Sequence, residues 1–94
     1  MPKRGQEIPE IYTEHLQALA QAIGRRVRQR RLQLGLTQEN VRVKAELESV
    51  FITRTKYSRL EKGERVPLAS EAIALAKVLN VSLDWLLLGH EEKA

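Results

Sequence analysis

The sequence predicts an all-α fold of five helices, and two observations carry that prediction. Apolar residues recur at three-, four- and seven-residue steps along most of the chain, which is the spacing of one helix face, and no segment makes a credible strand. Glycine, asparagine and hydroxyl residues interrupt this pattern at positions that suit helix ends and starts. The chain has 94 residues, of which 43% are hydrophobic and only 4% aromatic, so one small domain with an aliphatic core is expected.

The first helix is expected to run from about residue 9 to residue 34. Pro9 suits its first turn and Gly35 its end. Gly24 lies inside it and costs about 1 kcal/mol relative to alanine, so the helix either continues through this position or bends there. Its apolar stripe consists of Tyr12, Leu16, Leu19, Ile23, Val27 and Leu34.

Two short helices are expected to follow, each beginning after a threonine. Thr37 and Thr53 are good N-caps, and Gly63 suits the end of the second of these helices. The segment 46–52 between them, ELESVFI, is open to two interpretations. It either extends the helix that follows Thr37 as far as Glu48 or forms a long turn.

The last two helices complete the set. A strongly helical pattern covers residues 69–79, and Asn80 suits a left-handed cap. Ser82 is expected to cap a final helix with Asp84 in its first turn and Gly89 at its end. Of its residues, Leu83, Trp85 and Leu86 are expected in the core, whereas Leu87 and Leu88 exceed what one short helix can bury.

The charge distribution indicates a localised polyanion-binding face. The net charge is +4, but residues 21–65 hold twelve Lys and Arg against five Asp and Glu, while the rest of the chain holds four against seven. On a helical wheel of the segment that follows Thr53, hydroxyl and cationic side chains gather on one side, away from Tyr57, Leu60 and Glu61. These side chains are Thr55, Ser58, Arg59 and Lys62.

Several classes of protein are disfavoured. The chain has no cysteine, which excludes disulfides and thiolate metal sites and fits a reducing cytoplasm. No run approaches the roughly 18–20 apolar residues of a membrane span. His15 and His90 have no neighbours at metal-ligand spacing, and no catalytic triad, paired carboxylates or phosphate-binding glycine loop is present. We therefore expect neither an enzyme nor a cofactor or metal.

Three segments together resemble the Cro/C1-type (XRE) helix-turn-helix family, to which the lambdoid phage repressors belong. They are RVRQRRLQLGLTQENV, SRLEKGERVP and LAKVLNVSLDWLLLG, and the resemblance covers about residues 20–89. It implies a domain that crosses the DNA backbone with its first motif helix and places the second in the major groove. The expected organisation is a flexible basic arm (1–7), a helical N-terminal extension (8–22), the helix-turn-helix domain (23–89) and a tail (90–94).

The resemblance also implies roles for particular residues. Four residues match base-contacting positions of the family: Arg54, Thr55, Arg59 and Gln38. Their chemistry suits this role, since arginine can bind guanine and a threonine methyl can contact thymine. Phosphate contacts are expected from Thr37, Lys56, Ser58, Lys62 and Arg65. Arg31 and Glu61 match a structural ion pair that joins the first helix to the recognition helix.

The sequence departs from the family pattern at two places. The interval from Thr37 to Glu61 is longer than usual, and the extra residues lie within ELESVF, so a lengthened turn is expected in the motif. Arg30 stands where the family commonly has an apolar residue, and either Leu34 compensates or the Arg30 stem snorkels. The cluster of arginines around it is expected to be solvated or structural, with contact to DNA phosphates as the alternative; its members are Arg25, Arg26, Arg28, Arg30 and Arg31.

The sequence thus predicts a sequence-specific DNA-binding transcriptional regulator, with a repressor on a palindromic operator as the leading hypothesis. Its partners would be double-stranded DNA and a second copy of the chain, in a bacterial or phage context, cytoplasmic and nucleoid-associated. The extension either packs back on the domain or dimerises. No ligand sensor is expected in the chain, so concentration or a protein partner such as a toxin would regulate it.

The alternative is a protein-interaction module of the same fold, an antitoxin or a co-regulator partner, with little or no base readout. In that hypothesis Val50, Phe51 and Ile52 form the apolar anchor of a docking loop. The simpler interpretation is that these three residues pack into the core beside Tyr57.

Overall fold

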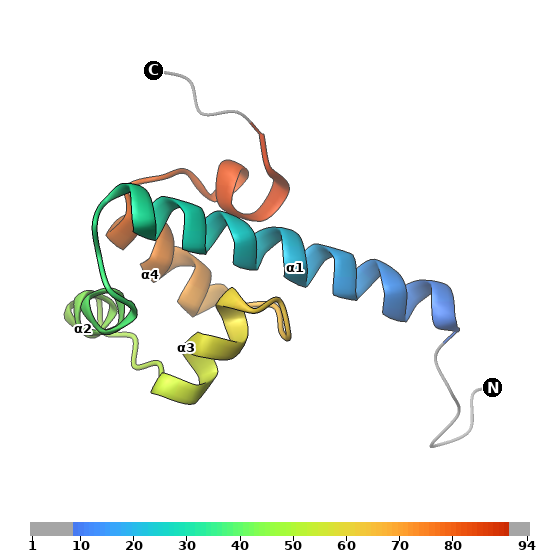
Figure 1. The fold of residues 1–94 in the computed structure, drawn as a ribbon, viewed down its shortest axis with the longest axis horizontal. Helices are drawn as coiled ribbons and strands as arrows, with labels where there is room; N and C mark the ends of the chain where they lie inside the picture. The colour runs from blue at the N-terminus through green and yellow to red at the C-terminus, as the bar shows by residue number, and fades with distance from the viewer. Residues whose placement is uncertain (1–8, 91–94) are drawn as a thin grey trace.

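The computed structural model describes residues 9–90 and contains five helical elements, as the sequence predicts (Figure 1). No strand occurs within these residues. The predicted arm at 1–7 and the tail from residue 91 lie outside the described part of the chain. The elements are α1 (Glu10–Gln33), α2 (Gln38–Leu47), α3 (Arg54–Glu61), α4 (Ala69–Leu79) and a π-helical turn, η1 (Asp84–Leu88).

Helix α1 is continuous from Glu10 to Gln33 and does not break at Gly24. Glycine is needed there because α3 approaches closely: a Cβ at position 24 would lie 2.5 Å from the carbonyl oxygen of Leu60 and 2.8 Å from that of Glu61. Figure 1 shows the second half of α1 packed along the other helices, while its first half extends beyond them.

The apolar stripe of α1 therefore divides into a buried part and an exposed part. Ile23 and Val27 are buried, but Tyr12 and Leu16 are 65% and 54% exposed. The interpretation that the extension packs back on the domain is wrong for these side chains. Leu34, at the other end of the stripe, is also exposed and does not fill the core.

The core draws on all five elements. Its buried members are mostly aliphatic, with Tyr57 the largest: Ile23, Val27, Val41, Ala45, Ile52, Tyr57, Leu60, Ala74, Leu75, Ala76, Leu79 and Leu86. Trp85 packs against this cluster while half-buried, but Leu83, which the sequence places in the core, is 40% exposed. The Leu83 prediction is wrong because the last element is a short π-helical turn, which directs a different set of side chains inward than an α-helix does.

Local capping signals determine where the helices start and stop. The Thr37 hydroxyl accepts from the amide of Asn40, whose side chain accepts from the Thr37 amide, and the Thr53 hydroxyl accepts from the amide of Lys56. Gly63, with φ 78°, and Asn80, with φ 55°, take the left-handed conformation that ends α3 and α4. Together these caps fix the lengths of the short helices that form the candidate site.

Candidate nucleic-acid interface

Helices α2 and α3 form a helix-turn-helix whose connecting turn is long. Helix α2 ends at Leu47 and α3 begins at Arg54, so most of the ambiguous segment 46–52 belongs to the turn. Ser49 adopts the left-handed conformation with φ 66°, and the Val50 amide returns to the carbonyl of Ala45 at 3.0 Å. This closes α2 in the manner usually provided by glycine.

The lengthened turn is attached to α2 by an arginine that the sequence analysis did not single out. The Arg42 Nε donates to the carbonyl oxygen of Ile52 at 3.0 Å. Ile52 itself is buried in the core, and Val50 packs against the core cluster, whereas Phe51 is 70% exposed. The turn therefore has a fixed path, and only Phe51 of its three apolar residues faces outward. The spacing of residue types in the sequence does not reveal this role of Arg42, because its partner is a backbone carbonyl and not a particular side chain.

Glu61, at the end of α3, is the centre of a buried polar network. Arg31 on α1 binds its carboxylate with two hydrogen bonds, from Nε at 2.7 Å and from Nη2 at 2.9 Å. The Tyr57 hydroxyl donates to the same group, and so does the Gln38 amide, at 3.1 Å. Because these donors come from α1, α2 and α3, the network fixes the orientation of α3 relative to α1 and α2.

The network also determines how these groups titrate. Burial opposes ionisation of Glu61, but the hydrogen bonds from Arg31, Tyr57 and Gln38 outweigh it and hold the pKa of the carboxyl group below its ordinary value. Burial, together with the bond to Glu61, raises the pKa of the Tyr57 hydroxyl. Glu61 is thus ionised and Tyr57 protonated near neutral pH.

The opposite face of α3 is open to solvent. Thr55, Lys56 and Arg59 are exposed, as is Lys62 just after the helix, and Ser58 is half-buried. The Arg54 side chain is 82% exposed and lies 3.5 Å from Glu39 of α2. Arg59 lies 3.9 Å from Glu64. Exposed pairs at such distances contribute little stability, so these arginines are free to exchange partners.

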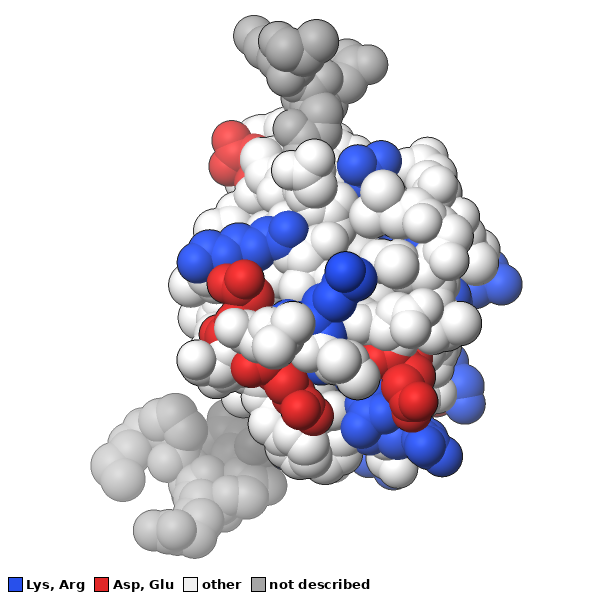
Figure 2. All heavy atoms as spheres, turned by 90° about the vertical axis from the view of Figure 1, so that its left-hand side faces the viewer, with Lys and Arg blue, Asp and Glu red and all other residues white. Residues whose placement is uncertain are grey.

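Acidic side chains accompany the cations on this part of the surface. Figure 2 views the molecule from the side where α2 lies in Figure 1, and its blue and red groups stand next to one another. Lys77 is likewise 3.6 Å from Glu48. The surface is therefore a mixed one on which individual cations, and not a uniform positive field, face outward.

Arg65 has a structural role that disfavours its predicted phosphate contact. Its guanidinium binds Glu71 of α4 at 2.7 and 3.2 Å and donates to the carbonyl of Lys56 at 3.0 Å. Glu71 also accepts from the Leu68 amide, which caps α4. Arg65 thereby joins α3 to α4, and a phosphate would have to displace these bonds. One signal in the sequence points to the Glu71 part of this arrangement: Glu71 is the third residue of α4, where a glutamate often caps the helix.

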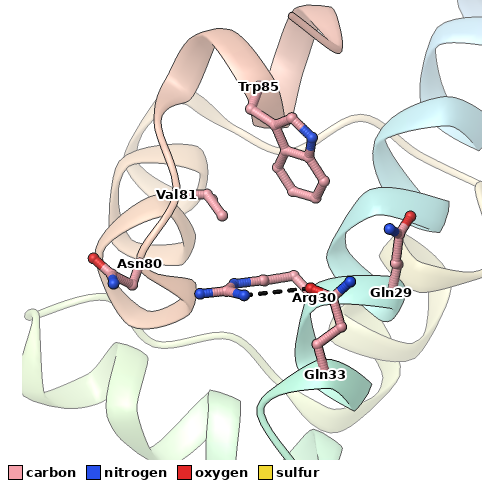
Figure 3. A pocket seen from close by; sticks show the side chains of 6 residues that line it. All are labelled: Gln29, Arg30, Gln33, Asn80, Val81 and Trp85. Carbon is pink, nitrogen blue, oxygen red and sulfur yellow. Dashed lines mark hydrogen bonds between the residues drawn. The ribbon is translucent and has the colours of Figure 1, made fainter. Parts of the chain in front are cut away.

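Two arginines of the α1 cluster are also engaged within the protein. The Arg26 Nη1 donates to the carbonyl of Leu86 at 2.7 Å and holds η1 against α1. The Arg30 Nε donates to the carbonyl of Leu79 at 2.9 Å, at the negative end of α4. Figure 3 shows the Arg30 side chain reaching toward the end of α4 near Asn80, with a second hydrogen bond to Gln33. Arg30 therefore lies across a helix end instead of filling the core, and it lines a pocket of about 390 Å³ with Gln29, Gln33, Asn80, Val81 and Trp85.

The described residues show neither a membrane-spanning helix nor a metal site. None of the helices within residues 9–90 is both long and apolar enough to cross a bilayer. No group of three or more His, Asp or Glu side chains in that range is placed to hold a metal ion.

A helix-turn-helix locked to its scaffold, with cations and hydroxyls facing outward from the second helix, is the architecture of a DNA-binding domain. A helix-turn-helix family model matches residues 27–86, and the chain belongs to the Cro/C1-type (XRE) helix-turn-helix family. It is 35% identical over 71 residues to the HTH-type transcriptional regulator DicA of Escherichia coli (strain K12). That match covers 76% of this chain and 49% of DicA, so the chain spans about half the length of this relative. No solved structure matches significantly.

Proposed function

We propose that this protein is a sequence-specific DNA-binding transcriptional regulator, a repressor that places α3 in the major groove. The observation that carries the proposal is the division of α3 into two faces. Tyr57, Leu60 and Glu61 are buried and fix the helix, while Thr55 and Arg59 point away from the core. A rigidly held helix with a polar outer face is what base readout requires.

Base readout is assigned to four side chains, one at the start of α2 and three on α3. Arg54 and Arg59 can each donate two hydrogen bonds to guanine O6 and N7, and the Thr55 methyl can contact a thymine. Gln38 donates one amide hydrogen to Glu61, which leaves its second amide hydrogen and its carbonyl oxygen available to a base. Contacts of this kind contribute about 1–3 kcal/mol of discrimination each.

Phosphate contacts would orient the domain without reading sequence. Lys56 and Lys62 are exposed at the edges of α3, and Ser58 lies between them. The Thr37 hydroxyl accepts from the Asn40 amide, so its own proton remains available for a phosphate oxygen at the positive end of α2. Arg65 is left out of this set because of its bonds to Glu71.

The protein would act as a two-fold dimer on a palindromic operator, with half-sites about one helical turn apart. Repression would follow from occlusion of a promoter that overlaps the operator. Such a protein would work in the cytoplasm on the bacterial or phage chromosome. Its occupancy would respond to its own concentration and to any protein partner that competes for the same faces.

An in vitro selection from random duplex DNA at fixed, near-physiological salt tests this proposal. The wild type should enrich a palindrome, and Arg59→Ala should blur it at one position in each half-site while leaving the thermal unfolding midpoint unchanged. Arg25→Ala is the matched control, since it removes the same charge from an exposed position on α1. Salt must be fixed because counterion release alone produces tight binding. Absence of any enriched sequence would contradict base readout.

One observation favours the alternative of an interaction module. Phe51 is 70% and Leu47 80% exposed, and both lie at the turn. If this pair anchors a protein partner, Phe51→Ala will abolish capture of that partner without loss of stability, and Arg59→Ala will leave capture intact. If the protein acts through DNA alone, Phe51→Ala will leave the selected DNA sequence unchanged.

A further inference from the structure

The first half of α1 carries an apolar surface that its own domain does not cover. Tyr12, Leu16 and Leu19 are 65%, 54% and 39% exposed and lie on one side of the helix. This half of α1 extends past the bundle in Figure 1. A helical segment of about ten residues has little stability of its own in water, so this half of α1 needs packing against another surface to remain helical.

The composition of this segment supports burial against protein. From Ile11 to Gly24 the only side chain that is charged at pH 7, with histidine neutral, is Glu14. At about 100° per residue Glu14 falls on the side of the helix opposite the apolar stripe. Interfaces between proteins are depleted of charge at their centres in the same way.

A groove lies at the base of the projecting half. It has a volume of about 280 Å³ and is lined by Leu19 and Ile23 of α1 together with Val66, Pro67, Leu87 and Leu88. Leu88 is 62% exposed, which accounts for the apolar excess of the WLLL segment. The exposed stripe and the groove are therefore continuous along one side of α1.

We propose that two copies of this chain dimerise through this side of α1, with the two helices antiparallel and each Tyr12 in the groove of the other copy. An apolar projection beside an apolar groove on one molecule is self-complementary under a two-fold axis. The register follows from the helix itself. Tyr12 of one copy lies opposite the groove between Leu19 and Ile23 of the other, which places the axis close to Leu16.

This dimer places the α3 helices of both copies on the same side of the assembly. That this side meets DNA rests on the proposed function. The two-fold axis of an antiparallel helix pair is perpendicular to the plane of the two helices. The α3-facing residues of α1, Gly24 and Arg31, lie about a quarter-turn around the helix from the stripe. The axis therefore runs in the direction from α1 to α3, and a half-turn about the vertical of Figure 1 keeps both α3 helices below α1.

The spacing agrees with B-form DNA. Gly24 and Arg31, the two α3-facing residues of α1, are centred about eleven residues from Leu16, which is about 16 Å along the helix. Two copies then separate their recognition helices by about 33 Å, close to the roughly 34–36 Å between half-sites one helical turn apart. The overlap of the two helices, about 21 Å, would be the core of the interface, and the groove would extend it.

The test uses the full chain without DNA, so its outcome does not depend on operator recognition. Sedimentation velocity should show a reversible dimer for the wild type and a monomer for Leu16→Lys. The matched control is Ala18→Lys, which adds the same charge on a side of α1 that faces neither the partner nor α3, and it should remain dimeric. A monomeric wild type, or a dimer that persists in Leu16→Lys, would overturn the proposal.

Cross-linking tests the antiparallel register, since the chain has no cysteine of its own. Leu16→Cys should form a disulfide-linked dimer on oxidation because the axis passes nearby, whereas Tyr12→Cys should not. Efficient cross-linking of Tyr12→Cys would instead show parallel helices and refute this arrangement. If the dimer forms as described but no DNA sequence is enriched, the proposed function fails while the interface stands.

Discussion

Gly24 of α1 and Leu60 of α3 meet backbone to backbone: a Cβ on residue 24 would lie 2.5 Å from the Leu60 carbonyl oxygen. In an open helix, replacing glycine by alanine stabilises by about 1 kcal/mol. Here we expect Gly24→Ala to lower the free energy of unfolding by about 1–3 kcal/mol, because two helices must separate to admit the methyl group. Urea unfolding gives the sign directly, and a gain in stability would show that α3 does not press on α1.

The Arg31–Glu61 pair should be costly to break from one side. Their side chains are only 10% and 3% exposed. Arg31→Met leaves a buried carboxylate with only Tyr57 and Gln38 as donors, and we expect a loss of about 3–5 kcal/mol in the free energy of unfolding. The double variant Arg31→Met, Glu61→Leu should lose less than Arg31→Met alone. Equal or additive losses would mean that the charge of Glu61 does not need compensation.

Acid should destabilise the fold through Glu61 and Glu71. Burial opposes ionisation of Glu71 as well, but the bonds from Arg65 and the Leu68 amide hold its pKa below the ordinary value of 4.5, as happens at Glu61. The folded state therefore binds fewer protons than the unfolded chain near that pH. The stabilisation is complete above about pH 5 and is lost as the pH falls through the two depressed values.

Urea midpoints measured from pH 7 down to pH 3 test this dependence. Glu71→Gln replaces the carboxyl group with an amide that does not titrate. The variant should therefore be less stable than the wild type at pH 7 and should lose less stability on acidification. An identical acid slope in both proteins would assign the acid sensitivity to other carboxyl groups.

Glu39 should weaken binding to DNA of any sequence. It lies 3.5 Å from Arg54 and 3.8 Å from Arg42, on the surface assigned to DNA. Glu39→Gln frees Arg54 and removes a negative charge, and we expect about a two- to five-fold gain in affinity for an unrelated duplex. Fluorescence anisotropy at one fixed salt concentration measures it. Glu46→Gln, two turns further along α2, is the control, and an equal gain there would indicate a mere net-charge effect.

The elements that the sequence predicts well depend on local chemistry. Thr37 and Thr53 start α2 and α3, and Gly63, Asn80 and Gly89 take the left-handed conformation that ends α3, α4 and η1, because these signals act within one turn of backbone. The all-α fold follows from the helical spacing of the apolar residues, and the family from the three segments that resemble the Cro/C1-type pattern.

The wrong prediction at Leu83, the unpredicted role of Arg42 and the bonds of Arg65 to Glu71 all depend on distant parts of the chain. Leu83 is exposed because a π-helical turn changes which side chains face inward. Arg65 is engaged by Glu71, and Arg42 by the Ile52 carbonyl, neither of which any periodicity in the sequence marks. An arginine in a sequence carries the same charge whether it will meet a phosphate, a carboxylate or a helix end.

Because α1 is one uninterrupted helix, its length fixes the distance from Leu16 to the part of the helix that contacts α3. If the chain dimerises near Leu16, the uninterrupted helix from Leu16 to Arg31 sets the separation of the two α3 helices and their rotational positions around the DNA duplex. One residue inserted in that stretch would shift each domain by about 1.5 Å and turn it by about 100°. Operator spacing would then be set by the length of one helix. An insertion of about eleven residues, three full turns, would restore the orientation of both α3 helices and lengthen their separation by about 33 Å, close to one further turn of DNA.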